Sequence, residues 1–265
     1  MDIVFDKQAD GIATITLNRP DKLNAFTHEM IDHWAAYVAD AAKDPAVKVV
    51  VLRGTGRGFC VGADADEMST RGRLEPLERR DFLWGHIHQI ALNIERMDKP
   101  LIGSINGLAR GAGCDMALMC DLRIASKSAS FAWSYINLNL IAGDGGTYYL
   151  PRIIGMPRAL ELFWTGRAVA AEEADRIGLV NRVVADEDLE AETMSLAAAI
   201  AAQPADAVRM YKRVAYQGEN QSLYSHLDMI ASHMATLRGS PENLRRIDQF
   251  RDERRLAREK KGGQG

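Results

Sequence analysis

The chain has 265 residues, of which 47% are hydrophobic and 26% charged, and this length suits one large globular domain with its own core. Its formal net charge of −3 gives no support to binding of nucleic acid or another polyanion over the whole surface. Three cysteines without framework spacing argue against a disulfide scaffold. Because we find neither a secretory leader nor a long apolar run, we expect a cytoplasmic protein without membrane contact.

A strand, a helix and a second strand are predicted near the N-terminus. Residues 12–17 alternate between apolar side chains and threonine, which is typical of a strand. Thr27 is a suitable N-cap for a helix that runs to about residue 42, before Asp44-Pro45 breaks it. The apolar run at 47–52 predicts a strand that is buried on both faces.

The middle of the chain combines a glycine-rich loop with short apolar segments. The loop at 54–64 is followed by a charged stretch at 65–80, which we interpret as a mobile surface segment. Helical periodicity predicts a helix at 82–95. Two further strands are predicted at 101–105 and 121–125.

The last third of the chain is predicted to be mostly helical. A turn at 144–147 precedes a helix, and short helices follow at 157–165 and 172–177. The charged and then glycine-rich C-terminal end predicts a disordered tail. We therefore expect an α/β core, a C-terminal helical region and a tail, at residues 1–185, 186–260 and 261–265.

The segment from Ser104 to Asp115 is the most informative one for function. It begins as an apolar strand and breaks into a turn with three glycines, Gly107, Gly111 and Gly113, directly before the acid. Glycine lets the main chain approach a ligand closely, and a helix N-terminus presents free N–H groups to an oxyanion. The pattern fits a catalytic site in which the acid moves protons. It fits equally well a tight turn into a core helix, with the acid favoured by the helix dipole.

Five motifs in chain order resemble the enoyl-CoA hydratase/isomerase (crotonase) superfamily, over about residues 3–260. They are NRPDKLNA at 18–25, GFCVGAD at 58–64, INGLARGAGCD at 105–115, GDGGT at 143–147 with LPRIIG at 150–155, and TGR through GLVNR at 165–182. The resemblance implies a crotonase-like spiral of ββα turns whose C-terminal helices assemble into trimers or dimers of trimers. It also implies an acyl-CoA thioester as substrate, with no separate cofactor and no metal.

The family stabilises an enolate with two main-chain N–H groups, and the resemblance places them at Ala63 and Ala112. Such donors must be fixed before charge develops, in a site that excludes water. The small residues around both positions leave room for a thioester. By the same resemblance, the residues that contact the acyl-CoA are Lys22, Leu23, Ala25, Ala63, Asp64, Ala65, Gly111, Ala112 and Trp133. Further candidates for the CoA phosphates, or else solvated surface charges, are Arg19, Arg53, Arg57 and Arg110.

Both glutamates of the family's hydratases are replaced. Asp115 stands in the first position and Tyr135 in the second. A phenol with a pKa of about 10 is a poor base at neutral pH, although it can donate a hydrogen bond or act as an acid. Asp144 is a possible replacement because related members place acids in or beside this turn, and its alternative role is to cap the next helix. Asp115 and Asp144 would form an acid/base couple if their surroundings separate their pKa values.

Other side chains near these acids allow two interpretations each. Trp133 and Tyr135 either narrow the acyl pocket or pack in the core. His86 and His88 lie on a helix that borders the acyl pocket in the family, and they either approach the thioester, or else face solvent or bond to other groups of the protein. No partner at zinc spacing accompanies the cysteines, which we interpret as buried apolar residues: Cys60, Cys114 and Cys120.

We therefore expect an enoyl-CoA hydratase-like enzyme that adds water across a 2,3-double bond. Double-bond isomerisation, or hydrolytic C–C cleavage with Asp144, is an alternative on the same oxyanion hole. A non-catalytic acyl-CoA-binding protein is the alternative from another class, and the two acids beside a complete glycine framework argue against it.

Overall fold

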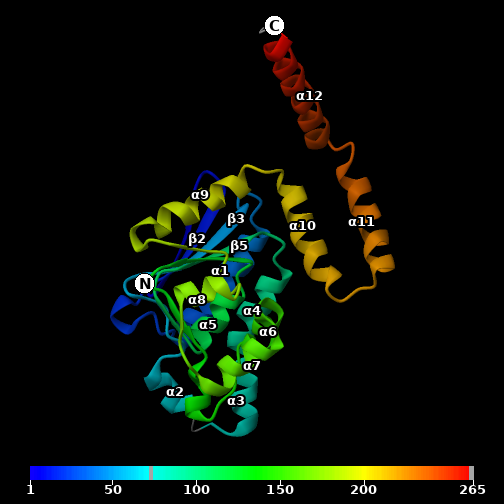
Figure 1. The fold of residues 1–265 in the computed structure, drawn as a ribbon. Coiled ribbons are helices and arrows are strands. Elements are labelled where there is room, and N and C mark those ends of the chain that lie inside the picture. The colour runs from blue at the N-terminus through cyan, green and yellow to red at the C-terminus, as the bar shows by residue number, and fades with distance from the viewer. Residues whose placement is uncertain (72–73, 263–265) are drawn as a thin grey trace. The chain divides into compact units, whose positions relative to one another are not determined.

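The computed structural model describes residues 1–71 and 74–262, and the chain divides into two compact units, Met1–Ala202 and Gln203–Gly265 (Figure 1). The strands of the first unit are β1 (Ile3–Lys7), β2 (Ile12–Leu17), β3 (Val49–Gly54), β4 (Gly58–Cys60), β5 (Leu101–Ile105), β6 (Leu108–Arg110), β7 (Leu122–Ser126), β8 (Ser130–Ala132), β9 (Val169–Ala170) and β10 (Arg182–Val184). Its helices are η1 (Pro20–Lys22), α1 (His28–Lys43), α2 (Ala65–Arg71), α3 (Pro76–Phe82), the π-helix η2 (Leu83–Ile87), α4 (His88–Arg96), α5 (Ala112–Leu118), η3 (Ser134–Leu138), α6 (Gly146–Ile154), α7 (Met156–Thr165), α8 (Ala171–Arg176), η4 (Asp186–Asp188) and α9 (Leu189–Ala201).

Two sheets form the framework of the first unit, in the orders β1-β2-β3-β5-β7-β10 and β4-β6-β8-β9. β1 pairs antiparallel with β2, and the rest of the larger sheet is parallel. Successive strands alternate between the sheets, as β3 and β4, then β5 and β6, then β7 and β8, each pair being followed by helical segments. The expected ββα spiral is therefore confirmed.

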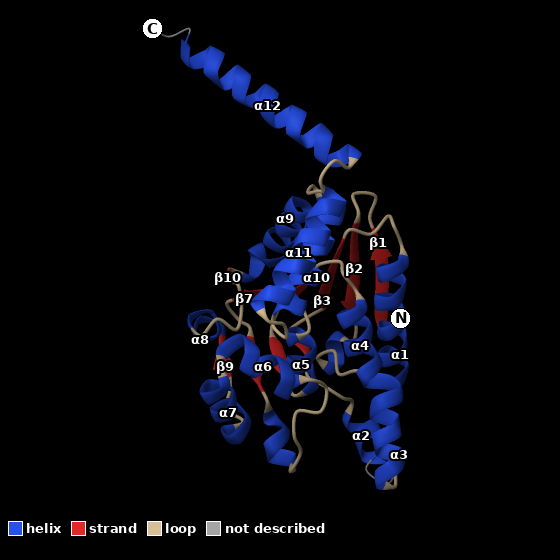
Figure 2. Cartoon of the chain, turned by 90° about the vertical axis from the view of Figure 1, so that its right-hand side faces the viewer, coloured by secondary structure: helices blue, strands red, loops and turns tan. Residues whose placement is uncertain are grey.

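The larger sheet is covered by apolar layers on both faces. On β3, Val49 and Val51 pack with α9, whereas Val50 and Leu52 belong to the main core with residues of α1 and α4. Figure 2 shows β2 and β3 between α9 on one side and α1 and α4 on the other. The prediction of a strand buried on both faces is confirmed, although β3 begins and ends two residues later than expected.

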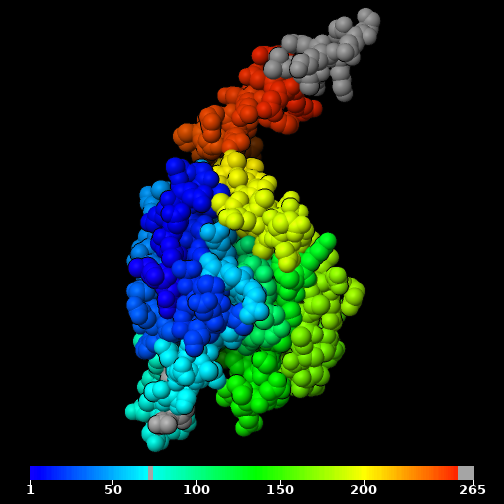
Figure 3. Space-filling view, turned by 90° about the vertical axis from the view of Figure 1, so that its left-hand side faces the viewer, coloured from blue at the N-terminus to red at the C-terminus, as the bar shows by residue number. Residues whose placement is uncertain are grey.

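The charged stretch at 65–80 contains two helices that the sequence analysis missed. Helix α2 covers Ala65–Arg71, and α3 begins at Pro76 behind a capping box formed by Glu75 and Glu78. Proline at the first position and reciprocal cap bonds start a helix even where no apolar stripe marks it. Residues 72 and 73 lie outside the described residues. In Figure 3 these cyan helices extend at one end of the unit, with a notch between them and the green chain around η3.

The second unit consists of α10 (Ala205–Gly218), α11 (Leu223–Leu237) and α12 (Pro241–Gly262). Helix α9 belongs to the first unit instead, because Ala197 and Ala201 pack on the sheet, so the division falls at Ala202 and differs from the one expected at residue 185. The expected tail at 261–265 begins inside α12, and residues 263–265 lie outside the described part. None of the described helices is long and apolar enough to cross a bilayer.

Candidate active site

Two glycine turns follow the neighbouring parallel strands β4 and β6. Gly62 has a φ of +90° and Gly111 a φ of +49°, which residues with a side chain rarely adopt. A Cβ on Gly62 would lie 3.4 Å from the nitrogen of Ala112, so the two turns lie side by side. The first turn is held in place by Phe26, whose N–H donates to the carbonyl of Gly62 at 2.9 Å.

The main-chain N–H groups of Ala63 and Ala112 are suited to binding an oxyanion. Ala112 is the first residue of α5, where helix geometry leaves N–H groups without an acceptor inside the helix. Within the described part of the chain, neither N–H has a protein acceptor. Gly113 lets α5 approach β4, because a Cβ there would overlap the carbonyl oxygen of Cys60. The two predicted donors therefore lie on adjacent turns and are available to a ligand.

Asp115 lies in the first turn of α5 and is fully buried. Its Oδ1 accepts from the indole N–H of Trp133 at 3.0 Å. Its Oδ2 accepts from the Tyr135 hydroxyl at 2.9 Å and from the Asp144 N–H at 3.2 Å. Burial and then the nearby charge of Asp144 raise the pKa of Asp115 to about 7, although these three hydrogen bonds act to lower it. A carboxyl that titrates near neutrality can serve as acid or base.

The Tyr135 hydroxyl bridges the two carboxyl groups. It lies 2.9 Å from Oδ2 of Asp115 and 3.2 Å from Oδ2 of Asp144. A phenol has one hydrogen to donate, so two hydrogen bonds require that one of the carboxyls carries a proton and donates to the phenol oxygen. Burial, followed by the charges of Asp115 and Asp144, raises the pKa of Tyr135 well above its usual value, so the phenol stays protonated near neutral pH. The three side chains therefore share two protons.

Asp144 does not occupy the N-cap of helix α6. That position belongs to Gly145, which has a φ of +107°, while the buried Asp144 carboxyl faces Tyr135. The capping alternative for Asp144 is therefore wrong, because the chain turns one residue later than the sequence suggested. The turn is also fixed from outside: Nε2 of His88 lies 2.8 Å from the carbonyl oxygen of Gly143.

The core interpretation of Trp133 is confirmed, but the sequence analysis did not foresee which partners Trp133 and the two histidines contact. Trp133 packs in the core, where it is 1% exposed, and at the same time donates to Asp115. His86 and His88 point to different partners: His88 contacts Gly143, whereas His86 contacts side chains of α1. No local sequence signal links either contact to the acids, because both partners come from distant segments.

The residues predicted to bind CoA are partly exposed and partly engaged with the protein. Lys22 is exposed at the end of η1. Arg19 instead pairs with Asp64 at 3.1 Å and donates to the carbonyl of Ala25 at 2.6 Å. Burial opposes ionisation of Asp64, but hydrogen bonds from the Asp66 N–H and from Arg19 hold its pKa below the usual value. Asp64 and Arg19 therefore stabilise the turn next to Ala63.

The remaining predicted contacts lie near the same turns or have partners of their own. Leu23 ends η1 with a φ of +49°, and Ala65 begins α2. Arg53 pairs with Glu190 at 2.7 Å, and Arg110 donates to the carbonyl of Ser130 at 2.6 Å. These two arginines are thus engaged within the first unit.

The three cysteines are buried free thiols, as predicted. Burial raises the pKa of Cys60 to about 12 and that of Cys114 well above its usual value. Thiols of this kind stay protonated at neutral pH and are poor nucleophiles.

The chain is similar to known proteins over most of its length. Residues 7–238 match the family model described as enoyl-CoA hydratase/isomerase. The chain is 37% identical over 218 residues to crotonyl-CoA hydratase of Syntrophomonas wolfei, with 82% of each protein covered. It is 33% identical over 242 residues to 1,2-epoxyphenylacetyl-CoA isomerase of Escherichia coli, covering 86% of this chain and 87% of that protein. The crystal structure of enoyl-CoA hydratase from Bacillus anthracis matches with a TM-score of 0.89 at 31% identity, covering 96% of this chain and 97% of that one.

Proposed function

The chain belongs to the enoyl-CoA hydratase/isomerase family, and from this premise we propose that it adds water across the 2,3-double bond of an enoyl-CoA. The thioester oxygen would bind between the N–H groups of Ala63 and Ala112, which suit the negative charge of an enolate. The notch between α2, α3 and the chain around η3 is a suitable place for the acyl group (Figure 3).

The Tyr135 bridge between Asp115 and Asp144 is the observation that supports hydration most strongly. Addition of water needs one group that takes a proton from the water attacking Cβ and another that gives a proton to Cα. The ionised carboxyl of the pair performs the first task, and the protonated carboxyl performs the second.

The same bridge explains how the pair returns to its starting state. After one turnover the proton sits on the other carboxyl, because one acid has gained a proton and its partner has lost one. Tyr135 touches both carboxyls, so it can donate its proton to one and accept a proton from the other. The pKa of about 7 for Asp115 makes this exchange feasible near neutral pH.

Loss of enoyl absorbance on incubation with crotonyl-CoA tests the proposal. We expect hydration by the wild type and a loss of about 10²-fold or more in kcat for both Asp115→Asn and Asp144→Asn. Asp188→Asn, which changes an exposed acid of η4, is the control and should remain active.

Product analysis decides between hydration and the alternatives. A 3-hydroxyacyl-CoA product supports the proposal. A shifted double bond would replace it with isomerisation, cleaved acyl products would indicate a C–C hydrolase, and tight acyl-CoA binding without turnover would indicate a binding protein. Full activity of both asparagine variants would exclude the acid/base couple.

We also propose that the protein works in the cytoplasm as a homotrimer or a dimer of trimers, with acyl-CoA as its small-molecule partner. Large apolar side chains are exposed on the helices of the second unit, and such surfaces are commonly covered by another chain: Tyr211, Tyr216, Leu223, Tyr224, Leu227, Met234, Leu244, Ile247 and Phe250. Light scattering coupled to size-exclusion chromatography measures the assembly, and a monomer at micromolar concentration would contradict this proposal.

A further inference from the structure

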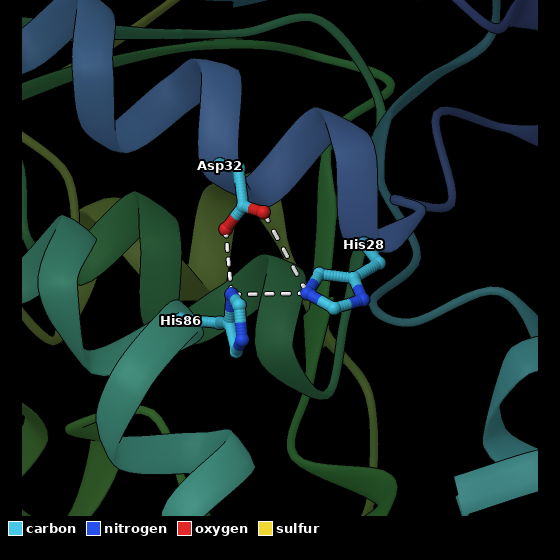
Figure 4. Close-up of side chains that lie close together, drawn as sticks. All are labelled: His28, Asp32 and His86. Atoms are coloured by element: carbon cyan, nitrogen blue, oxygen red, sulfur yellow. Dashed lines mark hydrogen bonds and ion pairs between the residues drawn. The ribbon is translucent and has the colours of Figure 1, made fainter.

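Two histidines and one aspartate converge on a point outside the acid cluster. His28 and Asp32 lie one turn apart on α1, and His86 comes from the π-helix η2 (Figure 4). Nδ1 of His86 lies 2.9 Å from Nε2 of His28 and 2.7 Å from Oδ1 of Asp32. Oδ2 of Asp32 lies 3.6 Å from Nε2 of His28. One ligand atom from each residue therefore faces the same small volume.

Proton sharing alone satisfies this arrangement poorly. Nδ1 of His86 makes both short contacts, and a single ring hydrogen there can point toward only one partner. If that hydrogen points to Asp32, His28 can offer no hydrogen to the same nitrogen. If Nδ1 carries no hydrogen, its lone pair faces a carboxylate oxygen 2.7 Å away. A cation in the middle would interact favourably with all three atoms at once.

We propose that His28, Asp32 and His86 form a binding site for a divalent first-row transition metal such as Zn²⁺. Imidazole nitrogen and carboxylate oxygen are the ligand types that such ions select. With metal–ligand bonds of about 2.1 Å, adjacent ligands lie about 3.0 Å apart in octahedral and about 3.4 Å apart in tetrahedral geometry. The separations of 2.9 Å between the two imidazole nitrogens and of 2.7 Å between Nδ1 of His86 and Oδ1 of Asp32 lie near the octahedral value and need only a small expansion. The distance of 3.6 Å from Nε2 of His28 runs to the other carboxylate oxygen, Oδ2, so either oxygen of Asp32 faces an imidazole nitrogen.

The surroundings hold the two imidazoles and leave one side open to solvent. The Phe82 ring lies edge-on to His28, with centroids 4.7 Å apart, and 4.8 Å from the ring of His86. The main-chain N–H of His28 donates to the carboxylate of Glu67 at 2.8 Å, which fixes the start of α1. The side chains of His28, Asp32 and His86 are 44%, 51% and 33% exposed, so water can complete the coordination. Because the ligands come from two elements, a bound ion would connect α1 with η2.

Isothermal titration of chelator-treated full-length protein with Zn²⁺ tests the site. We expect one ion per chain in the wild type and a loss of affinity of about 100-fold for His86→Ala and for the conservative Asp32→Asn. His33→Ala is the matched control: His33 lies on α1 and stacks on Tyr37, outside the cluster, so binding should not change. Circular dichroism without metal verifies that each variant is folded.

Two results would overturn the proposal. One is the absence of a saturable Zn²⁺ site in the wild type at about 100 µM free ion. The other is equal affinity of the wild type and the folded Asp32→Asn variant, which would mean that the ion binds elsewhere. A visible absorption band of Co²⁺ that disappears in His86→Ala but persists in His33→Ala would support imidazole coordination at this cluster.

Discussion

The two glycine turns at Gly62 and Gly111 and the Asp115–Tyr135–Asp144 cluster share helix α5, which carries Ala112 and Asp115, but they are built from different parts of the chain. The turns use main-chain N–H groups whose position depends on glycines in two loops. The cluster uses side chains that are 20 and 29 residues apart along the chain and that fix one another by hydrogen bonds. The first part depends on glycine conformations and on one close main-chain approach at Gly113, whereas the second depends on which oxygen atom carries the shared proton. The two parts should therefore respond to different substitutions.

Gly113→Ala should have the largest effect, because it acts on the main chain. Its methyl group would overlap the carbonyl oxygen of Cys60, so α5 must move and the Ala112 N–H with it. We expect kcat to fall by about 10²- to 10³-fold, as for loss of an oxyanion donor. Gly85→Ala is the control, since a Cβ at Gly85 would meet no atom within 4 Å.

Turnover of enoyl-CoA by both glycine variants, together with their thermal unfolding, checks this prediction. A folded Gly113→Ala protein with normal kcat would show that the close approach of α5 to β4 does not position the oxyanion donor.

Asp115→Asn should change how stability depends on pH. The pKa of Asp115 is raised from 3.8 to about 7 in the folded protein. Its contribution to the free energy of unfolding is therefore fully present below pH 3.8 and is lost as pH rises through about 7. The buried carboxyl then costs the wild type up to about 4 kcal/mol at alkaline pH. Asparagine does not ionise, so the variant should lose less stability over this window.

Urea unfolding of wild type and Asp115→Asn at about pH 5 and about pH 8 measures this difference. The free energy of unfolding of the variant should rise relative to the wild type at the higher pH. Parallel curves would mean that Asp115 binds protons equally in the folded and unfolded chains, and the proton-sharing cluster would then lose its physical basis.

Tyr135→Phe isolates the bridge while keeping the ring. The ring packs beside Gly111, 3.8 Å from where a Cβ would be, so its shape should be preserved while the shared hydrogen disappears. We expect kcat to fall by about 10- to 100-fold with KM little changed, because proton transfer is affected more than binding. The pH profile of kcat should shift as well, and an unchanged profile would exclude Tyr135 from the proton path.

The difference between the two parts also explains what the sequence could and could not predict. Glycine spacing constrains the main chain locally, so the turns at Gly62 and Gly111 and the acid that follows the second turn were predicted from the residues. The assignment of the Ala63 and Ala112 N–H groups as oxyanion donors came from the family resemblance and stays a prediction. The bonds of Trp133 and Tyr135 to Asp115 depend on how distant segments pack, and no local pattern encodes them. The same limit applies to His28 and Asp32, whose spacing of four residues is visible in the sequence but whose partner His86 is not.

Secondary structure followed the same rule. The long apolar strands β2, β3 and β5 were predicted because periodicity needs several residues to show. The strands β4, β6 and β8 were not predicted, because three residues each are too few to show hydrophobic periodicity. These short strands lie next to the glycine turns, so the sequence indicated the turns without the sheet that supports them.

His88→Ala should have the smallest effect, because it acts on the acid cluster only through the main chain. With Nε2 protonated, His88 donates to the carbonyl of Gly143 at 2.8 Å and holds the residue before Asp144. Loss of this bond should lower kcat by about fivefold through misplacement of the acid, with little change in KM. Partial rescue by His88→Gln, whose amide can donate to the same carbonyl, would identify a positioning role, and steady-state kinetics of both variants beside His33→Ala measures it. Equal loss in kcat for alanine and glutamine, or a loss confined to KM, would instead place His88 in contact with the acyl group, and the side-chain part of the site would then extend beyond the two acids and the phenol.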